Sequence, residues 1–190
     1  MRCESTRLPG LCVIKPRVFR DERGFFNETF RANVLSDFGI ISEWVQDNHS
    51  RSQEGVLRGI HFQLGAGQAK LVRCARGAVL DVAVDLRRRS PTYGQWEAFR
   101  LDDENLMMLY LPAGFGHAFL VLSPTADVVY KCSSYYDPEL ERVIAHDDPD
   151  LAIEWPVDDP ILSERDRAAP RLREIAAELP FVFEPEVEPA

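Results

Sequence analysis

The sequence predicts an all-β protein, a sandwich or barrel with a few short helices that lie mainly toward the C-terminus. Short stretches in which apolar and polar residues alternate recur from Leu11 to Cys132, and a period of two is typical of strands that bury one face. Gly, Pro and Asp residues separate these stretches at the spacing expected of a sandwich or barrel.

The predicted strands follow one another with tight turns between several of them. They are Leu11–Phe19, Gly24–Phe30, Ser42–Ser50, Gly55–Gln63, Ala69–Cys74, Ala78–Asp85, Gln95–Leu101, Met107–Leu111, His117–Leu122 and Val128–Cys132. Residues suited to tight turns occur at Asp21–Gly24, Ala75–Gly77 and Pro112–Gly114.

Helical spacing of apolar residues is confined to a few segments. Arg31–Phe38 is predicted to form a short helix. Glu164–Leu179 is a second candidate, and Pro170 inside it favours a division into two short pieces. From Asp137 onward the chain is rich in Asp, Glu and Pro, and we expect this part to wrap around the barrel.

The length of 190 residues and a hydrophobic share of 45% suit one domain with a sizeable core. We expect residues 1–183 to form this domain and residues 184–190, which are acidic and contain prolines, to form a frayed tail.

The net charge of -9 and the pI of 5.0 argue against nucleic acid as a partner, since affinity for a phosphate backbone comes from clustered Lys and Arg. No apolar run approaches the roughly 20 residues of a membrane-spanning helix, so we expect no membrane partner. The 4 cysteines are scattered without a Cys-x-x-Cys motif, which favours a reducing, cytoplasmic environment.

Polar residues share one face of two predicted strands. Alternation places His61 and Gln63 on the same face of one strand, where they could line a cavity. In another strand it places Asp81 and Asp85 opposite a strongly apolar face. A carboxylate inside a barrel is costly unless it is paired, so we expect a His or a cation beside it. Asp81 either orients a ligand-binding His or supports the lumen.

His61 by itself is compatible with a structural or a catalytic role. Arg58 and Lys70 lie close to it in the sequence, and His117 and Tyr130 lie on later strands. Together these residues would supply bases, an acid and cations to one lumen.

A divalent metal site is an alternative interpretation of the same strand. Small β-barrels often hold a metal through a His-x-His pair, but the corresponding positions here are His61 and Gln63. With 4 histidines in the chain, no compact set of three ligands is evident. We therefore expect no metal.

A set of ordered motifs is distributed over about residues 10–175. The motifs are Pro16–Phe19, Asp21–Phe26, Val45–Ser50, Val56–Gln63, Lys70–Cys74, Ser90–Trp96, Gly114–Phe119 and Leu162–Asp166. In this combination the chain resembles the dTDP-4-dehydrorhamnose 3,5-epimerase family. The resemblance implies a cupin-type jelly-roll β-barrel, a cofactor-independent isomerase, a dTDP-sugar substrate and a homodimer formed by strand exchange.

The resemblance also implies catalytic roles. His61 would be the base that removes the C3 and C5 protons of a dTDP-4-keto-6-deoxyhexose, and Asp166 would orient it. Tyr130 would return a proton to the opposite face at C5, and Lys70 would stabilise the enolate oxygen at C4. The chemistry requires such groups, because an enolate next to a ketone needs both a base and a cation at neutral pH.

Further positions match ligand contacts of the family. They are Arg23, Glu28, Gln46, Asp47 and Asn48 around the thymidine, Tyr136 stacked on the base, Arg58 on the diphosphate, and His117, Glu141 and Arg165 elsewhere on the ligand. Family members often have Lys at the position of Arg165, so the positive charge is retained.

Other functions remain open from the sequence. Relatives with this fold epimerise only C3 or only C5, and more distant ones move the ketone between C3 and C4. The presence of both His61 and Tyr130 favours the double epimerase. A non-catalytic sugar-binding barrel would be expected to lack the His, Lys or Tyr of this set.

Overall fold

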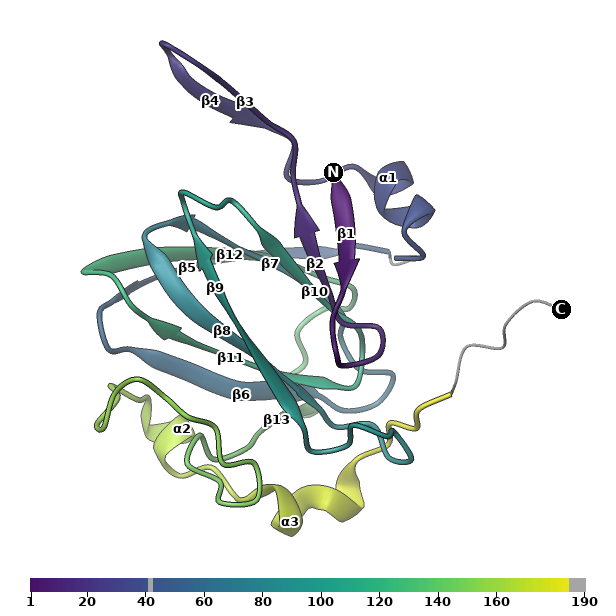
Figure 1. Ribbon diagram of the computed structural model, residues 1–190. Coiled ribbons are helices and arrows are strands. Elements are labelled where there is room, and N and C mark those ends of the chain that lie inside the picture. The colour runs from purple at the N-terminus through teal and green to yellow at the C-terminus, as the bar shows by residue number, and fades with distance from the viewer. Residues whose placement is uncertain (41–42, 185–190) are drawn as a thin grey trace, which may run out of the picture.

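The computed structural model describes residues 1–40 and 43–184, in which two antiparallel sheets face each other as a barrel (Figure 1). The first sheet has the order β1 (Arg2–Ser5), β2 (Cys12–Lys15), β10 (Met108–Leu111), β7 (Lys70–Arg76), β12 (Thr125–Cys132), β5 (Gln46–Gln53). The second has the order β13 (Glu141–Val143), β6 (Leu57–Gln63), β11 (Phe115–Val121), β8 (Ala78–Asp85), β9 (Trp96–Asp102). The predicted all-β jelly-roll class is confirmed.

The first predicted strand differs from the observed structure. Leu11–Phe19, predicted as one strand, forms β2 and then β3 (Val18–Asp21), because Pro16 interrupts it and has no N–H for a ladder. β3 pairs with β4 (Gly24–Asn27) in a separate hairpin that extends away from the barrel (Figure 1). β1 and β13 were not predicted. The strand predicted as Ser42–Ser50 corresponds to β5, which begins at Gln46. Residue 42 itself lies outside the described residues.

Alternation along each strand separates the barrel interior from the outer layers. On β8, Val79 and Ala83 join the core between the two sheets, whereas Val82 and Val84 belong to a second core on the outer side. Asp81 alternates in step with Val79 and Ala83, so it faces inward as they do, and it is fully buried. The lumen therefore contains ionisable groups within an apolar wall, as the pattern of this strand predicts.

The C-terminal segment covers the outer face of the second sheet (Figure 1). Its helices are α2 (Glu164–Arg167), α3 (Leu172–Ile175) and the 3₁₀ helix η1 (Ala176–Glu178). Leu172 and Ile175 pack in one cluster with Ile60 and Phe62 of β6. The expected division of the predicted helix at Pro170 is confirmed, and the packing holds α2 close to β6.

The predicted short helix near the N-terminus is present as α1 (Ala32–Asp37). Its buried Leu35 packs with Ile14, Leu71 and Met108 on the outer face of the first sheet. In the part of the chain that the structure describes, no helix is long and apolar enough to cross a membrane. Of the expected frayed tail, residues 184–190, the structure describes residue 184, and residues 185–190 lie outside the described residues.

Candidate active site

A bulge in β6 places Arg58 and His61 on the same face of the second sheet. Strict alternation would direct them to opposite faces, because they are three positions apart. In the pairing of β6 with β11, however, His61 lies opposite His117 and Arg58 lies opposite Phe119, so β6 contains one additional residue between these pairs. Both side chains line a cleft of about 340 Å³ together with residues of the α2 segment.

Gly59 makes this bulge possible. Its φ is +127°, a conformation that residues with a side chain rarely adopt. A Cβ atom at this position would lie 2.4 Å from the Cβ of Ala118 on β11. Only glycine allows β6 and β11 to approach this closely while Arg58 and His61 face the cleft.

His61 is paired with a carboxylate from the C-terminal segment. Its Nε2 lies 2.5 Å from Oδ1 of Asp166, which is 4% exposed. Ser163 caps α2 by accepting the backbone N–H of Asp166, and its hydroxyl donates to Asp166 Oδ2 at 2.8 Å. Burial acts to raise the pKa of Asp166, but hydrogen bonds from His61 and Ser163 outweigh it and lower the pKa. The carboxylate is thus held ionised beside the imidazole.

His117 forms a second His–Asp pair deeper in the lumen. Its Nε2 lies 3.0 Å from Oδ2 of Asp81 and 3.1 Å from Oδ1. Burial lowers the pKa of His117, and the nearby Asp81 carboxylate opposes this effect. The expectation that a His or a cation accompanies Asp81 is confirmed.

Lys70 and Tyr130 extend into the lumen from the opposite sheet. The Lys70 Nζ lies 5.9 Å from the centroid of the Tyr130 ring, which in turn lies 6.3 Å from the ring of His117. Burial lowers the pKa of Lys70, which is 8% exposed. Burial raises the pKa of Tyr130. A cation and a phenol thus lie across the barrel from strand β6.

An exposed aromatic ring and a cation lie at the rim of the cleft. The Tyr136 hydroxyl donates to Glu141 Oε2 at 2.9 Å, and Arg165 forms an ion pair with the same carboxylate. The backbone N–H of Tyr136 donates to Gln46 Oε1 at 2.8 Å, and Gln46 Nε2 donates to Asn48 Oδ1 at 3.0 Å. This rim thus offers a ring face and a positive charge next to the His61 cleft.

The family model described as dTDP-4-dehydrorhamnose 3,5-epimerase matches residues 5–174. The dTDP-4-dehydrorhamnose 3,5-epimerase of Methanothermobacter thermautotrophicus is 51% identical over 173 residues, which are 90% of this chain and 94% of that protein. The protein of the same name from Pseudomonas aeruginosa is 49% identical over 169 residues, 88% of this chain and 93% of that one.

The chain belongs to the dTDP-4-dehydrorhamnose 3,5-epimerase family.

Solved structures of this family agree with the fold. The Legionella pneumophila dTDP-6-deoxy-D-glucose-3,5-epimerase, in complex with dTDP-4-keto-L-rhamnose, has a TM-score of 0.93 and 47% identity, covering 97% of this chain and 99% of that one. A 3'-monoepimerase from Streptomyces bikiniensis, in complex with dTDP-quinovose, has a TM-score of 0.86 and 43% identity, covering 93% and 91%. The predicted cupin-type fold and the predicted isomerase function, a dTDP-4-dehydrorhamnose 3,5-epimerase, are confirmed.

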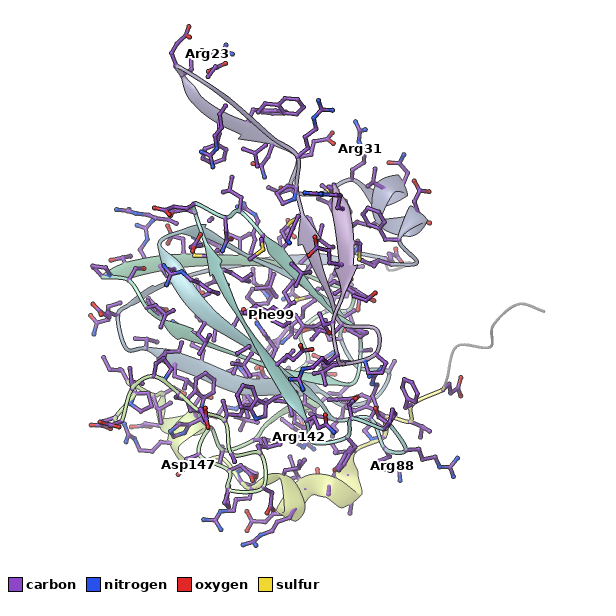
Figure 2. All side chains as sticks on the ribbon, in the orientation of Figure 1. Arg23, Arg31, Arg88, Phe99, Arg142 and Asp147 are labelled. Carbon is purple, nitrogen blue, oxygen red and sulfur yellow. The ribbon has the colours of Figure 1, made fainter. Side chains whose placement is uncertain are left out.

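The structure gathers most, but not all, of the predicted site residues of this epimerase. Arg23 lies at the tip of the β3–β4 hairpin, away from the barrel, where it forms an ion pair with Asp21 (Figure 2). Glu28, just after the hairpin, pairs with Arg31. Asp47 pairs with Lys131, and strand alternation directs its side chain to the other face of β5 from those of Gln46 and Asn48. These three predicted positions therefore do not join the lumen of their own chain.

Two residues that support the epimerase site were not among those predicted. Gln63 donates from Nε2 to Ser134 Oγ and to the Tyr135 carbonyl, and its Oε1 accepts the backbone N–H of Asp137. Gln63 thereby anchors the loop that carries Tyr136. Its place on the same polar strand face as His61 is the sequence feature that could have identified it as a site residue. Ser163 lies within the Leu162–Asp166 motif, and its hydroxyl holds the Asp166 carboxylate.

Across residues 1–40 and 43–184, no group of three or more His, Cys, Asp or Glu side chains is arranged to hold a metal ion.

Proposed function

We propose that this epimerase inverts both C3 and C5 of dTDP-4-keto-6-deoxy-D-glucose, with His61 as the base, and so forms dTDP-4-keto-L-rhamnose. The observation that carries the proposal is the 2.5 Å contact between His61 Nε2 and Asp166 Oδ1 at a cleft, with Lys70 and Tyr130 across the same lumen. A carboxylate only accepts, so the neutral ring carries its proton on Nε2 and its lone pair on Nδ1. Nδ1 is then the atom that removes a proton from carbon.

Lys70 is proposed to stabilise the enolate. Removal of a proton next to the C4 ketone places negative charge on the C4 oxygen. The Lys70 ammonium attracts this charge strongly, because at 8% exposure it is weakly screened by water. The same burial that lowers the pKa of Lys70 increases its attraction for an oxyanion. Lys70 lies on the sheet opposite His61, as required for a sugar held between the two sheets.

Tyr130 is proposed as the acid that completes inversion. A base and an acid on opposite sides of the sugar ring allow a proton to leave one face and return to the other. Tyr130 belongs to the first sheet and His61 to the second, so the two groups meet this requirement.

The rim of the cleft is proposed to bind the dTDP part of the substrate. Tyr136 presents an exposed ring for stacking, since base–aromatic contacts need only a free ring face. Arg58 lines the cleft and is placed to bind the diphosphate, for which guanidinium groups are well suited. Further ligand contacts are proposed for Gln46, His117, Glu141 and Arg165.

We also propose that the chain forms a homodimer by exchange of the β3–β4 hairpin. The hairpin exposes Phe19, Phe25 and Phe26, the last of them 67% exposed. Phe19 and Phe26 lie opposite each other with ring centroids 6.5 Å apart, and exposed aromatic rings that cluster in this way commonly mark a contact surface. Such an exchange would give Arg23, Glu28 and Asp47 a role at a site that two chains share. Phe26→Asp is expected to shift the sedimentation coefficient toward that of a monomer, and an unchanged coefficient would contradict the exchange.

The enzyme is further proposed to act in the cytoplasm. All 4 cysteines are free thiols in the structure, as expected in a reducing compartment.

The decisive experiment is incubation with dTDP-4-keto-6-deoxy-D-glucose in deuterated water, with and without chelator, followed by NMR. Deuterium entry at both C3 and C5, abolished by His61→Ala, is the expected result. Entry at one carbon alone would favour a mono-epimerase, an alternative supported by the 43% identity to the Streptomyces 3'-monoepimerase. No entry at either carbon would overturn the proposal, and exchange that requires the metal removed by the chelator would overturn its cofactor independence.

A further inference from the structure

A chain of hydrogen bonds connects the Tyr136 loop with the barrel lumen. The Tyr136 backbone N–H donates to Gln46 Oε1, and Gln46 Nε2 donates to Asn48 Oδ1. Because a backbone N–H only donates, Gln46 must present its oxygen to Tyr136 and its NH₂ group to Asn48. One backbone group therefore determines the orientation of both amides.

Asn48 consequently turns its NH₂ group, and not its oxygen, toward the lumen. Its Nδ2 donates to Cys132 Sγ at 3.6 Å. An amide nitrogen carries two hydrogens, so one N–H remains beyond the contact with Cys132. Asn48 lies directly opposite Tyr130 in the pairing of β5 with β12, and directly opposed side chains lie on the same face of a sheet.

We propose that Asn48 is a positioning residue for the catalytic acid: it donates its second N–H to the Tyr130 hydroxyl oxygen and stabilises the phenolate left after proton transfer. This inference rests on the proposed function of Tyr130. In that step the Tyr130 O–H bond breaks and the electron pair of the enolate forms the new C5–H bond. The C4 carbonyl is restored, and the negative charge remains on the Tyr130 oxygen.

The surroundings of Tyr130 make such a donor valuable. The titratable and charged groups that face it are Lys70 from β7, His117 from β11, Cys132 from its own strand, Glu141 from β13 and Arg58 from β6. Burial is the largest effect on the pKa of Tyr130 and raises it, whereas the hydrogen bond with Asn48 lowers it. A hydrogen bond to the phenolic oxygen favours the charged form over the neutral one.

The same geometry distinguishes this role from direct contact with the nucleotide. The Asn48 oxygen is already occupied by Gln46, and one N–H is occupied by Cys132. If Asn48 acts through Tyr130, its loss should reduce turnover at C5 rather than the affinity for dTDP.

Asn48→Asp tests the inference with nearly unchanged shape. The new carboxylate still accepts from Gln46 but presents an acceptor to Tyr130. We expect kcat for inversion at C5 to fall by roughly tenfold to a hundredfold, the size expected for a lost hydrogen bond to a charged group. KM should change by less than about threefold. Deuterium exchange at C5 should continue, because His61 still removes and returns the proton on its own face.

Two further variants complete the test. Asn33→Asp makes the same replacement at an exposed position on α1 and should leave inversion unchanged. Asn48→Ala removes the donor without adding a charge and should move the alkaline limb of the kcat profile that belongs to Tyr130 to higher pH.

Raised KM with unchanged kcat in the Asn48 variants would assign Asn48 to nucleotide binding alone and overturn the inference. Equal loss of exchange and inversion, together with a lower unfolding midpoint, would show a structural role and also overturn it. Failure of the proposed function is a separate result, since the unmodified protein would then show no exchange.

Discussion

His61 and His117 lie directly opposite each other on neighbouring strands, yet each pairs with a different carboxylate. His61 contacts Asp166 from the C-terminal segment, and its side chain is 28% exposed at the cleft. His117 contacts Asp81 on β8, and its side chain is 6% exposed. This difference in exposure predicts different purposes for the two pairs, a ligand-facing one for the pair at the cleft and a mainly structural one for the enclosed pair.

Replacement of each histidine by Asn should separate these purposes. His61→Asn is expected to lower kcat by at least about 10²-fold, the usual contribution of a general base. Its loss of unfolding free energy should be smaller than that of His117→Asn, because Ser163 still donates to the Asp166 carboxylate. His117→Asn should leave Asp81 buried without its imidazole partner and reduce the free energy of unfolding by about 1–3 kcal/mol. Urea unfolding and steady-state kinetics on both variants provide the check, and equal stability losses would contradict the distinction.

Asp166 should make stability depend on pH in the acid range. Its pKa in the folded protein is lowered, so its ionised form favours folding. This contribution is fully present above the unfolded pKa of about 3.9 and is lost as the pH falls through the lower folded value. The stability difference between the wild type and Asp166→Asn should therefore be constant near neutral pH and shrink below about pH 4. A difference that grows on acidification would show the opposite sign.

Lys70 should determine an alkaline limit of activity. Burial lowers its pKa from the ordinary value of 10.5, so the ammonium loses its proton at a lower pH than an exposed lysine does. In Lys70→Arg the cation stays protonated, and the alkaline limb of kcat/KM should move to higher pH even if the maximum rate is lower. Lys70→Met should remove the cation at every pH, and full activity in this variant would contradict the enolate role.

Gly59→Ala should destabilise the barrel and disturb the cleft. The added Cβ would meet Ala118 at 2.4 Å in a backbone conformation that already disfavours a side chain. We expect a loss of at least about 3 kcal/mol, the sum of overpacking and backbone strain. Gly94→Ala is the matched control, because Gly94 has a φ of +74° but no atom within 4 Å of the added Cβ. Its cost should be limited to about 1 kcal/mol of strain, and equal losses in the two variants would contradict the close approach.

Much of the fold could be predicted from local pattern. Alternation and turn residues indicated most strands, since a half-buried strand must alternate whatever it pairs with. The failures have physical causes. Pro16 divides a stretch whose apolar pattern continues through it, and β13 is only 3 residues long and depends on β6 for its pairing.

The sequence by itself determined the class of fold, the polar face that carries His61 and the set of residues by which the chain resembles its family. Only the tertiary structure decided which of these residues meet. The bulge at Gly59 places Arg58 on the same face as His61. The capped helix α2 brings Asp166 next to His61, although the two are 105 positions apart in the sequence. The hairpin carries Arg23 away from the lumen. Contacts between distant segments depend on register and chain direction in three dimensions, and residue spacing along the sequence does not contain that information.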